Sequence, residues 1–127
     1  HNGTFRGNNA AFVTATAALE SFWSDTRLTD DVRRRHATVM QSLGRLAERF
    51  HPHLQPPRGK GLLCGLGCRE PEIAGRILGE CYERGLILET SGGRDEVVKL
   101  LPPLTVTDDE LDTGLAILAD SVEAALS

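Results

Sequence analysis

The sequence predicts an α+β fold in which helices cover one face of a small, largely antiparallel sheet. Three observations lead to this prediction. Short apolar runs at 62–68, 86–89 and 96–101 are typical of strands. Apolar residues recur every three or four positions in the segments around these runs, which is typical of amphipathic helices. Gly, Pro and Asn separate the segments. The predicted order is helix, long helix, strand, helix, strand, strand, helix.

The chain begins with a polar segment rich in Gly and Asn, residues 1–9, and an Ala-rich run follows it at once. Ala is the best helix former, so we expect a helix from Ala10 to about Ser24, capped by Asn8 or Asn9. Its apolar residues recur at helical spacing and predict a buried face. These residues are Phe12, Ala15, Ala18 or Leu19, and Phe22.

Residues 1–9 have two physical interpretations. Glycines let a backbone approach a ligand closely, and the unpaired amides at the start of the next helix carry partial positive charge, so the segment suits a phosphate group. The Thr4 hydroxyl would add a hydrogen bond. The alternative is an ordinary turn that ends in a helix cap, which is the more common use of Gly and Asn before a helix.

A second, longer helix is expected to begin at Thr29 and to end near His51, because Pro52 disfavours helical backbone at the residue before it. Thr29 is the expected cap, and the two aspartates after it suit the positive end of the helix dipole. The basic run 33–35 is expected on a solvated face. The apolar stripe of this helix consists of Val32, Val39, Leu43, Leu46 and Phe50, with Met40 and Ala47 alongside.

Residues 55–61 are rich in Pro and Gly and predict a linker or turn. The apolar run 62–68 after them predicts a central strand. A third helix is expected from Pro71, in its first turn, to Gly85, its C-cap. Its inner face consists of Ile73, Ile77, Leu78 and Cys81.

Two more strands are expected at 86–89 and 96–101, with a turn at Gly92 and Gly93 between them. Residues 107–110 read Thr-Asp-Asp-Glu, which is a capping box with Thr at the cap and Glu three residues later. It predicts the start of a last helix. The apolar stripe of that helix is Leu111, Leu115, Leu118, Val122 and Leu126.

With 127 residues the chain is long enough for one small domain. A formal net charge of -4 without a dominant basic block argues against nucleic acid as a partner. No apolar run reaches the ~20 residues that span a bilayer, and residues 1–9 lack the apolar core of a signal peptide. Three cysteines without a secretory signal indicate reduced thiols and a cytoplasmic protein.

No metal site is expected from the sequence. Cys64 and Cys68 are four positions apart, which is not the CxxC spacing of zinc sites, and free cysteines commonly pack as small apolar side chains. His51 and His53 flank a proline in a turn that has no acidic or Cys residue close by. We therefore expect these two histidines in a surface loop.

Residues 1–9, with the Ala-rich run after them, resemble the segment that follows the catalytic lysine in class III aminotransferases. That family has fold type I and uses pyridoxal 5'-phosphate. Its usual pattern is His-Gly-Ser-Thr-Phe/Tyr-Gly-Gly-Asn-Pro. Arg6 in place of a Gly and Asn9 in place of the Pro resemble the members that make diaminobutyrate for ectoine synthesis.

The resemblance implies that Gly3, Thr4 and Phe5 bind the cofactor, with Thr4 reaching the phosphate held by the neighbouring subunit. Arg6 becomes a candidate for substrate binding, because a Gly is more usual at its position. The family's Schiff-base lysine, and the acid that partners the pyridine nitrogen, precede the first motif. We therefore expect a C-terminal fragment with no catalytic residue of its own and no activity alone, an expectation that the absence of a starting methionine also favours.

Three further segments resemble the family in the same order along the chain. Residues 58–63 resemble its Arg-Gly-x-Gly-Leu strand, residues 85–89 its Gly-Leu-Leu strand, and residues 97–104 its Ile-Arg-Leu-Leu-Pro-Pro-Leu segment. Many members have an arginine at the position of Lys99, and that arginine binds a substrate carboxylate. Lys99 is therefore a second substrate-binding candidate, with a looser grip because an ammonium lacks the planar fork of a guanidinium. The alternative is a solvated lysine at a strand end.

The resemblance also implies a division of the chain. Residues 1–28 would end the large cofactor-binding domain, 29–57 would form a long connecting helix and linker, and 58–127 would form the C-terminal small domain. The implied protein is a cytoplasmic homodimer or higher homo-oligomer, with a site shared across subunits and with small amino acids, oxo acids and aldehydes as partners.

The implied reaction moves the amino group of glutamate to L-aspartate 4-semialdehyde and gives L-2,4-diaminobutyrate and 2-oxoglutarate. Pyridoxal phosphate carries the amino group between the two. Two alternatives remain open. One is another class III aminotransferase, acting on ornithine, 4-aminobutyrate or acetylornithine. The other is a non-enzymatic α+β module that uses its long helix to dimerise.

Overall fold

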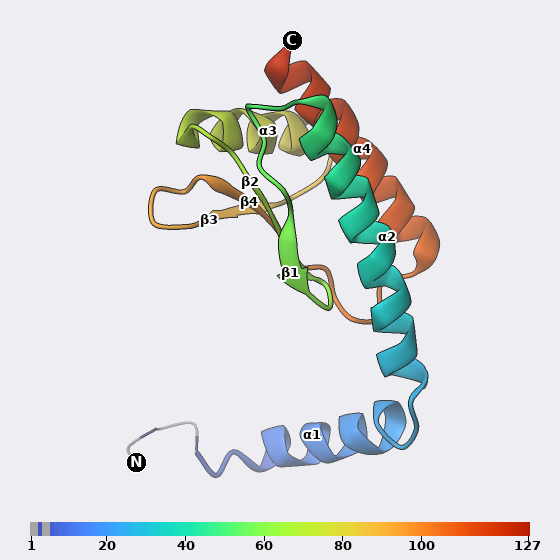
Figure 1. The fold of residues 1–127 in the computed structure, drawn as a ribbon. Coiled ribbons are helices and arrows are strands. Elements are labelled where there is room, and N and C mark those ends of the chain that lie inside the picture. The colour runs from blue at the N-terminus through green and yellow to red at the C-terminus, as the bar shows by residue number, and fades with distance from the viewer. Residues whose placement is uncertain (1–2, 4–5) are drawn as a thin grey trace. The chain divides into compact units, whose positions relative to one another are not determined.

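The structure is a computed structural model that describes residue 3 and residues 6–127 (Figure 1). It divides into two compact units, residues 1–31 and residues 32–127. The first unit contains α1 (Asn9–Phe22) and the start of α2 (Arg27–Arg49). The second contains the rest of α2, four strands and the last two helices. The predicted α+β class is confirmed.

Helix α1 forms as expected, but its predicted buried face is wrong for the described residues. Asn8 caps the helix, and none of its 14 residues is buried. Phe12 is 60% exposed and Leu19 is also 60% exposed. Helical spacing identifies an apolar face, but burial also requires a surface that packs on it, and the first unit by itself provides none.

Helix α2 begins at Arg27, before the predicted cap at Thr29. The side chain of Asp25 accepts a hydrogen bond from the Arg27 N–H at 2.9 Å, so a carboxylate one turn earlier satisfies the helix start. The predicted end is confirmed, because the helix stops at Arg49, before Pro52. The predicted stripe is also confirmed, since Val39, Leu43 and Leu46 are buried.

A four-stranded sheet lies in the second unit, with β1 (Arg58–Lys60), β2 (Leu63–Gly67), β3 (Glu89–Ser91) and β4 (Val97–Leu100). The strand order is β1-β2-β4-β3, and every neighbouring pair is antiparallel, as predicted. The linker that composition predicted at 58–60 is wrong, whereas the strand that the family resemblance implied there is present. Gly61, at a φ of 57°, turns the chain so tightly that Lys60 pairs with Leu63.

The strand predicted at 86–89 is misplaced, because pairing starts at Glu89 and the three residues before it lie outside the ladder. The end of α3 (Pro71–Glu83) explains this shift. Gly85 has a φ of 83°, and the Leu86 N–H donates to the Cys81 carbonyl at 2.9 Å. The backbone of Leu86 therefore closes the helix end and is not free to pair with β4.

The last helix, α4 (Asp108–Leu126), begins with the predicted capping box. The Thr107 hydroxyl accepts from the Glu110 N–H, and the Glu110 carboxylate accepts from the Thr107 N–H at 2.8 Å. Helices α2 and α4 lie side by side and run in the same direction (Figure 1), joined by Arg49 and Glu123 with their charged atoms 2.5 Å apart.

The basic run 33–35 is not a purely solvated face as predicted. Both Arg34 and Arg35 contact Asp108, at the start of α4, at 2.9 Å. The side chain of Arg35 is only 13% exposed. These contacts join α2 to the amino end of α4, where a carboxylate also favours the helix dipole.

The core of the second unit lies between the three helices and one face of the sheet. Strand residues alternate in direction, so Val98 and Leu100 of β4 point into this core, while Val97 and Lys99 point to the other face. Gly65 of β2 lies beneath Val97, because a Cβ at Gly65 would stand 2.8 Å from the Val97 Cγ1. The helical core residues include Leu43, Leu46, Ile73, Ile77, Leu115, Leu118 and Val122.

Candidate functional site

Two of the predicted cofactor residues, Thr4 and Phe5, lie outside the described residues. Gly3 and Arg6 are described, and both are exposed. The Arg6 N–H donates to the Gly3 carbonyl at 3.2 Å and closes a turn. The Arg6 side chain folds back over this turn, since its Cγ is 3.4 Å from the place that a Cβ at Gly3 would occupy.

The first amides of α1 are not available to a phosphate. The side-chain oxygen of Asn8 accepts hydrogen bonds from the Ala10 N–H at 3.1 Å and the Ala11 N–H at 3.3 Å. For these two amides the structure shows the turn-and-cap arrangement. Phosphate binding by Gly3, Thr4 and Phe5 stays a prediction.

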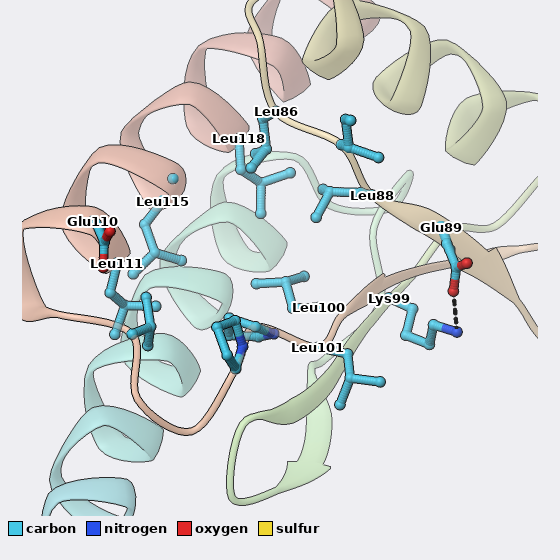
Figure 2. Close-up of a pocket in the computed structure, with 15 residues that line it drawn as sticks. Leu86, Leu88, Glu89, Lys99, Leu100, Leu101, Glu110, Leu111, Leu115 and Leu118 are labelled. Carbon is cyan, nitrogen blue, oxygen red and sulfur yellow. Dashed lines mark ion pairs between the residues drawn. The ribbon is translucent and has the colours of Figure 1, made fainter.

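The other predicted substrate residue, Lys99, is held in the second unit by the β3–β4 ladder. Its partner across the ladder is Glu89, and the Lys99 Nζ lies 2.6 Å from the Glu89 Oε2 (Figure 2). The hydrogen bond from Lys99, together with its positive charge, holds the pKa of the Glu89 carboxyl below its ordinary value. Lys99 lies within β4 (Val97–Leu100) and not at its end, and its side chain is paired with Glu89 and is only 26% exposed.

A pocket of about 550 Å³ opens beside this ion pair. Its walls come from the segment before β3, from the end of β4 with the prolines after it, and from one face of α4. Figure 2 shows Leu88, Leu100 and Leu118 facing the hollow, with Glu89 and Lys99 at its edge. The pocket is therefore apolar within and carries its charges at the rim, which suits a small ligand with a hydrocarbon chain and an ionic end.

Sequence reasoning missed Glu89 as part of this site. The signal was present, because a hairpin that turns at 92–95 places Glu89 opposite Lys99 when the register is counted back from the turn. The turn itself was predicted, but its register was not used.

The cysteines and histidines make no reactive site in the described part of the chain. Cys64, Cys68 and Cys81 are free and buried, as their predicted packing role requires, and burial raises the pKa of the Cys68 thiol to about 11. His36 lies 3.8 Å from the Cys64 sulfur, but its Nδ1 is 2.8 Å from the Gly61 carbonyl. That nitrogen must donate to the carbonyl, so it cannot take a proton from the thiol.

Neither a metal cluster nor a membrane span appears in the part of the chain that the structure describes. No group of three or more His, Cys, Asp or Glu side chains is placed there to hold a metal ion. None of the described helices is long and apolar enough to cross a bilayer.

Comparison with known proteins identifies the family. The model of the family "Aminotransferase class-III" matches residues 1–122. The chain belongs to the class III aminotransferases. These enzymes depend on pyridoxal phosphate, so the expected cofactor is confirmed for the family.

Relatives and solved structures agree with this family. The chain is 53% identical to a diaminobutyrate–2-oxoglutarate transaminase of Nocardia farcinica over 97% of its own length and 28% of the relative. It is 48% identical to the enzyme of that name from Bordetella parapertussis, covering 100% of the chain and 29% of the relative. The ornithine aminotransferase structure from Toxoplasma gondii matches with a TM-score of 0.82 at 27% identity, over 98% of this chain and 29% of that one. The chain thus spans less than a third of the length of these relatives.

Proposed function

We propose that this chain is the C-terminal part of a diaminobutyrate–2-oxoglutarate aminotransferase of ectoine synthesis. The intact protein would move the amino group of glutamate to L-aspartate 4-semialdehyde, in the cytoplasm and as a homodimer or higher homo-oligomer. The observation that supports this reaction is the similarity to relatives of that name, at 53% and 48% identity across almost the whole chain. The ornithine aminotransferase structure is similar at 27% identity.

The proposal divides the chain as the resemblance implies. Residues 1–28 end the cofactor-binding domain, 29–57 connect, and 58–127 form the small domain over the substrate. Gly3, Thr4 and Phe5 hold the phosphate of the cofactor, whose chemistry is to carry the amino group between substrates. The chain has no lysine at a position that matches the Schiff-base residue, so the chain alone is inactive.

Within this function, Lys99 binds a carboxylate of the substrate. Its ammonium lies at the rim of the apolar pocket, and the covered stem of the side chain fixes where the charge stands. A charged hydrogen-bond donor at this place can orient a ligand carboxylate. Arg6, which lies in the first unit, is proposed as a second substrate residue.

The activity test uses the intact protein, with the upstream part of the coding region restored. With glutamate as donor, we expect turnover of aspartate 4-semialdehyde well above that of the aldehydes derived from ornithine, 4-aminobutyrate and acetylornithine. A preference for one of these three would replace the proposed substrate. Amino transfer that does not require pyridoxal phosphate, or no transfer to any of the four aldehydes, would overturn the proposed aminotransferase function.

The residue test compares variants of the same intact protein. Lys99→Met should raise the KM for glutamate by about 10- to 100-fold, since hydrogen bonds to charged groups are worth about 1.5–3 kcal/mol. Lys60→Met, on β1 at the opposite edge of the sheet, is the matched control and should change little. Arg6→Ala should weaken substrate handling more than cofactor retention, and an unchanged KM for both substrates would contradict its role.

A further inference from the structure

One row of residues crosses three strands of the sheet on the face that is turned away from the core. Arg58 of β1 is paired with Gly65 of β2, which is paired in turn with Lys99 of β4. Side chains of residues paired in this way leave a sheet on the same face. Arg58 and Lys99 therefore stand on one face, with their Cα atoms two strand spacings, or about 10 Å, apart.

The space between these two cations has a low, apolar floor. Gly65 has no side chain, and a Cβ placed there would stand 2.8 Å from the Val97 Cγ1. Val97 is buried and points to the same face as Lys99, so its methyl group fills the place beside Gly65. The row therefore has a positive charge at each end and a hydrocarbon surface in the middle.

The charge of Arg58 is available to a ligand. Arg58 lies on an edge strand and is exposed. In the part of the chain that the structure describes, its guanidinium makes no ion pair and donates no hydrogen bond. Its charge attracts Glu96, but that carboxylate accepts a hydrogen bond from the Arg94 N–H at 2.8 Å and is engaged in the turn before β4.

We propose that Arg58 is a specificity-determining residue that binds the second carboxylate of a dicarboxylate substrate whose first carboxylate is on Lys99. This inference rests on the proposed function, in which Lys99 binds a substrate carboxylate. The planar fork of a guanidinium matches the two oxygens of a carboxylate, so Arg58 suits this role. Both side chains are long enough to turn toward a ligand between them, and its methylene groups would then lie over Val97.

The two ends of the row separate the substrates of the proposed reaction into two classes. Glutamate and 2-oxoglutarate carry two carboxylates and can engage Arg58 and Lys99 together. Aspartate 4-semialdehyde and 2,4-diaminobutyrate carry one carboxylate and gain nothing from a second cation. Arg58 therefore acts on the amino donor and its oxo acid, and leaves the binding of the aldehyde as it is.

The test measures binding of glutarate, an unreactive five-carbon dicarboxylate, to the cofactor-loaded intact enzyme by calorimetry. Arg58→Met keeps an unbranched side chain and removes its charge. We expect it to weaken glutarate binding about ten-fold, the low end for a hydrogen bond between charged groups, because Arg58 is exposed. Arg58→Lys keeps the charge without the fork, so its affinity should fall between those of Arg58→Met and the parent.

Steady-state kinetics of the same variants separate a binding role from a structural one. In Arg58→Met the KM for glutamate should rise by a factor similar to the loss of glutarate affinity. The KM for aspartate 4-semialdehyde should stay as it is in the parent, because this substrate has a single carboxylate. A damaged sheet would raise both KM values together.

Lys60→Met is the matched control, because Lys60 is an exposed cation two positions along β1 and points to the same face as Arg58. Its partner across the ladder is Leu63, whose 52% exposed side chain separates Lys60 from β4. The variant makes the same change in net charge as Arg58→Met. It should leave glutarate binding and both KM values unchanged.

Three results would overturn the inference: unchanged glutarate binding in Arg58→Met, an equal loss in Lys60→Met, or an equal rise of both KM values in Arg58→Met. The proposed function fails separately. If Lys99→Met leaves glutarate binding unchanged, the carboxylate role of Lys99 is wrong and the inference falls with it. If Lys99→Met weakens binding but Arg58→Met has no effect, the role of Lys99 stands and only the inference about Arg58 is wrong.

Discussion

Helices α1 and α4 both start at a polar cap and both carry apolar residues at helical spacing, yet only α4 buries them. Leu111, Leu115 and Leu118 of α4 are buried, whereas Phe12 and Leu19 of α1 are each 60% exposed. The local signals for the two helices are alike, and the difference is whether another surface packs on the apolar face. For α4 that surface is the sheet with α2 and α3.

The difference teaches how to interpret an apolar stripe in a chain that spans less than a third of its relatives. A helix that is apolar over much of its surface belongs in a protein interior. Helix α1 has a single charged residue, Glu20, and buries none of its residues here. We therefore expect α1 to be covered in the longer protein, and the difference between α1 and α4 can be tested by mutation.

The largest effect is expected from truncating a covered leucine. Leu43 of α2 is fully buried, so Leu43→Ala in the 127-residue chain should lower the free energy of unfolding by about 2–5 kcal/mol. Leu19→Ala on α1 removes the same atoms from an exposed site and should change it by less than about 0.5 kcal/mol. Urea unfolding followed by circular dichroism measures both.

The same leucine pair checks whether α1 is covered in the longer protein. In the intact enzyme, Leu19→Ala should become clearly destabilising while Leu43→Ala keeps its cost. Equal and small effects of Leu19→Ala in both proteins would mean that this face of α1 stays in solvent.

A second comparison contrasts two glycines within the second unit. A Cβ at Gly59 of β1 would stand 2.4 Å from the Leu63 carbonyl oxygen and 2.7 Å from the Cys64 Cα, so Gly59→Ala forces the hairpin apart. We expect a loss of about 1–3 kcal/mol of stability. Gly75, on the exposed side of α3, has nothing within 4 Å, and Gly75→Ala should add about 0.5–1 kcal/mol. Thermal unfolding would show a lower midpoint for Gly59→Ala and a higher one for Gly75→Ala. Midpoints that shift in the same direction would contradict the close approach of β2 to Gly59.

Removing the caps of α4 and α1 is expected to give a smaller but still measurable difference in stability. Thr107→Ala removes the hydroxyl that accepts from the Glu110 N–H, and should lower the stability of the second unit by about 1 kcal/mol. Asn8→Ala removes the equivalent acceptor from α1. Because α1 buries none of its residues, this change should reduce helical content without moving the main unfolding transition. A shifted main transition in Asn8→Ala would show that α1 is coupled to the core.

Patterns that depend on neighbours in the sequence were predictable here. The capping box at Thr107 and the stripe of α2 through Leu43 each follow from residues three or four positions apart, and both are confirmed. The hydrogen bond from the Arg27 N–H to Asp25 was missed although it is equally local, because Thr29 with two aspartates after it gave the stronger start signal.

Features that depend on distant partners were predicted poorly. Residues 58–60 were predicted as part of a linker from the Pro and Gly content of 55–61, whereas the family resemblance implied a strand, and they form one by pairing with β2. Residues 86–88 are apolar enough for a strand, but Leu86 is held by the end of α3 and lines a pocket instead. In the site, Lys99 was found from its resemblance to the family, while Glu89 required the register of a hairpin. Thr4 and Phe5 stay predictions.

The smallest expected effect is on how stability depends on pH. It compares an aspartate of the second unit, Asp108, with one of the first unit. Hydrogen bonds from Arg34 and then Arg35 hold the pKa of Asp108 below its ordinary value of 3.8. The charged form is therefore favoured on folding, so this contact stabilises the protein above pH 3.8 and its contribution is lost as the pH falls through the lowered value. The unfolding free energy of Asp108→Asn should be below that of the parent at pH 7, and the two should converge in acid.

Asp25 is the matched control, because its pKa is also lowered, by the Arg27 backbone N–H and then by the Arg27 side chain. Its contact stays within the first unit, between residues two positions apart, whereas Asp108 joins α4 to α2. Asp25→Asn should therefore leave the acid dependence of the main unfolding transition as it is in the parent. If both variants changed that dependence equally, the local contact would count as much as the one between helices, and the contrast between the units would not extend to their charges.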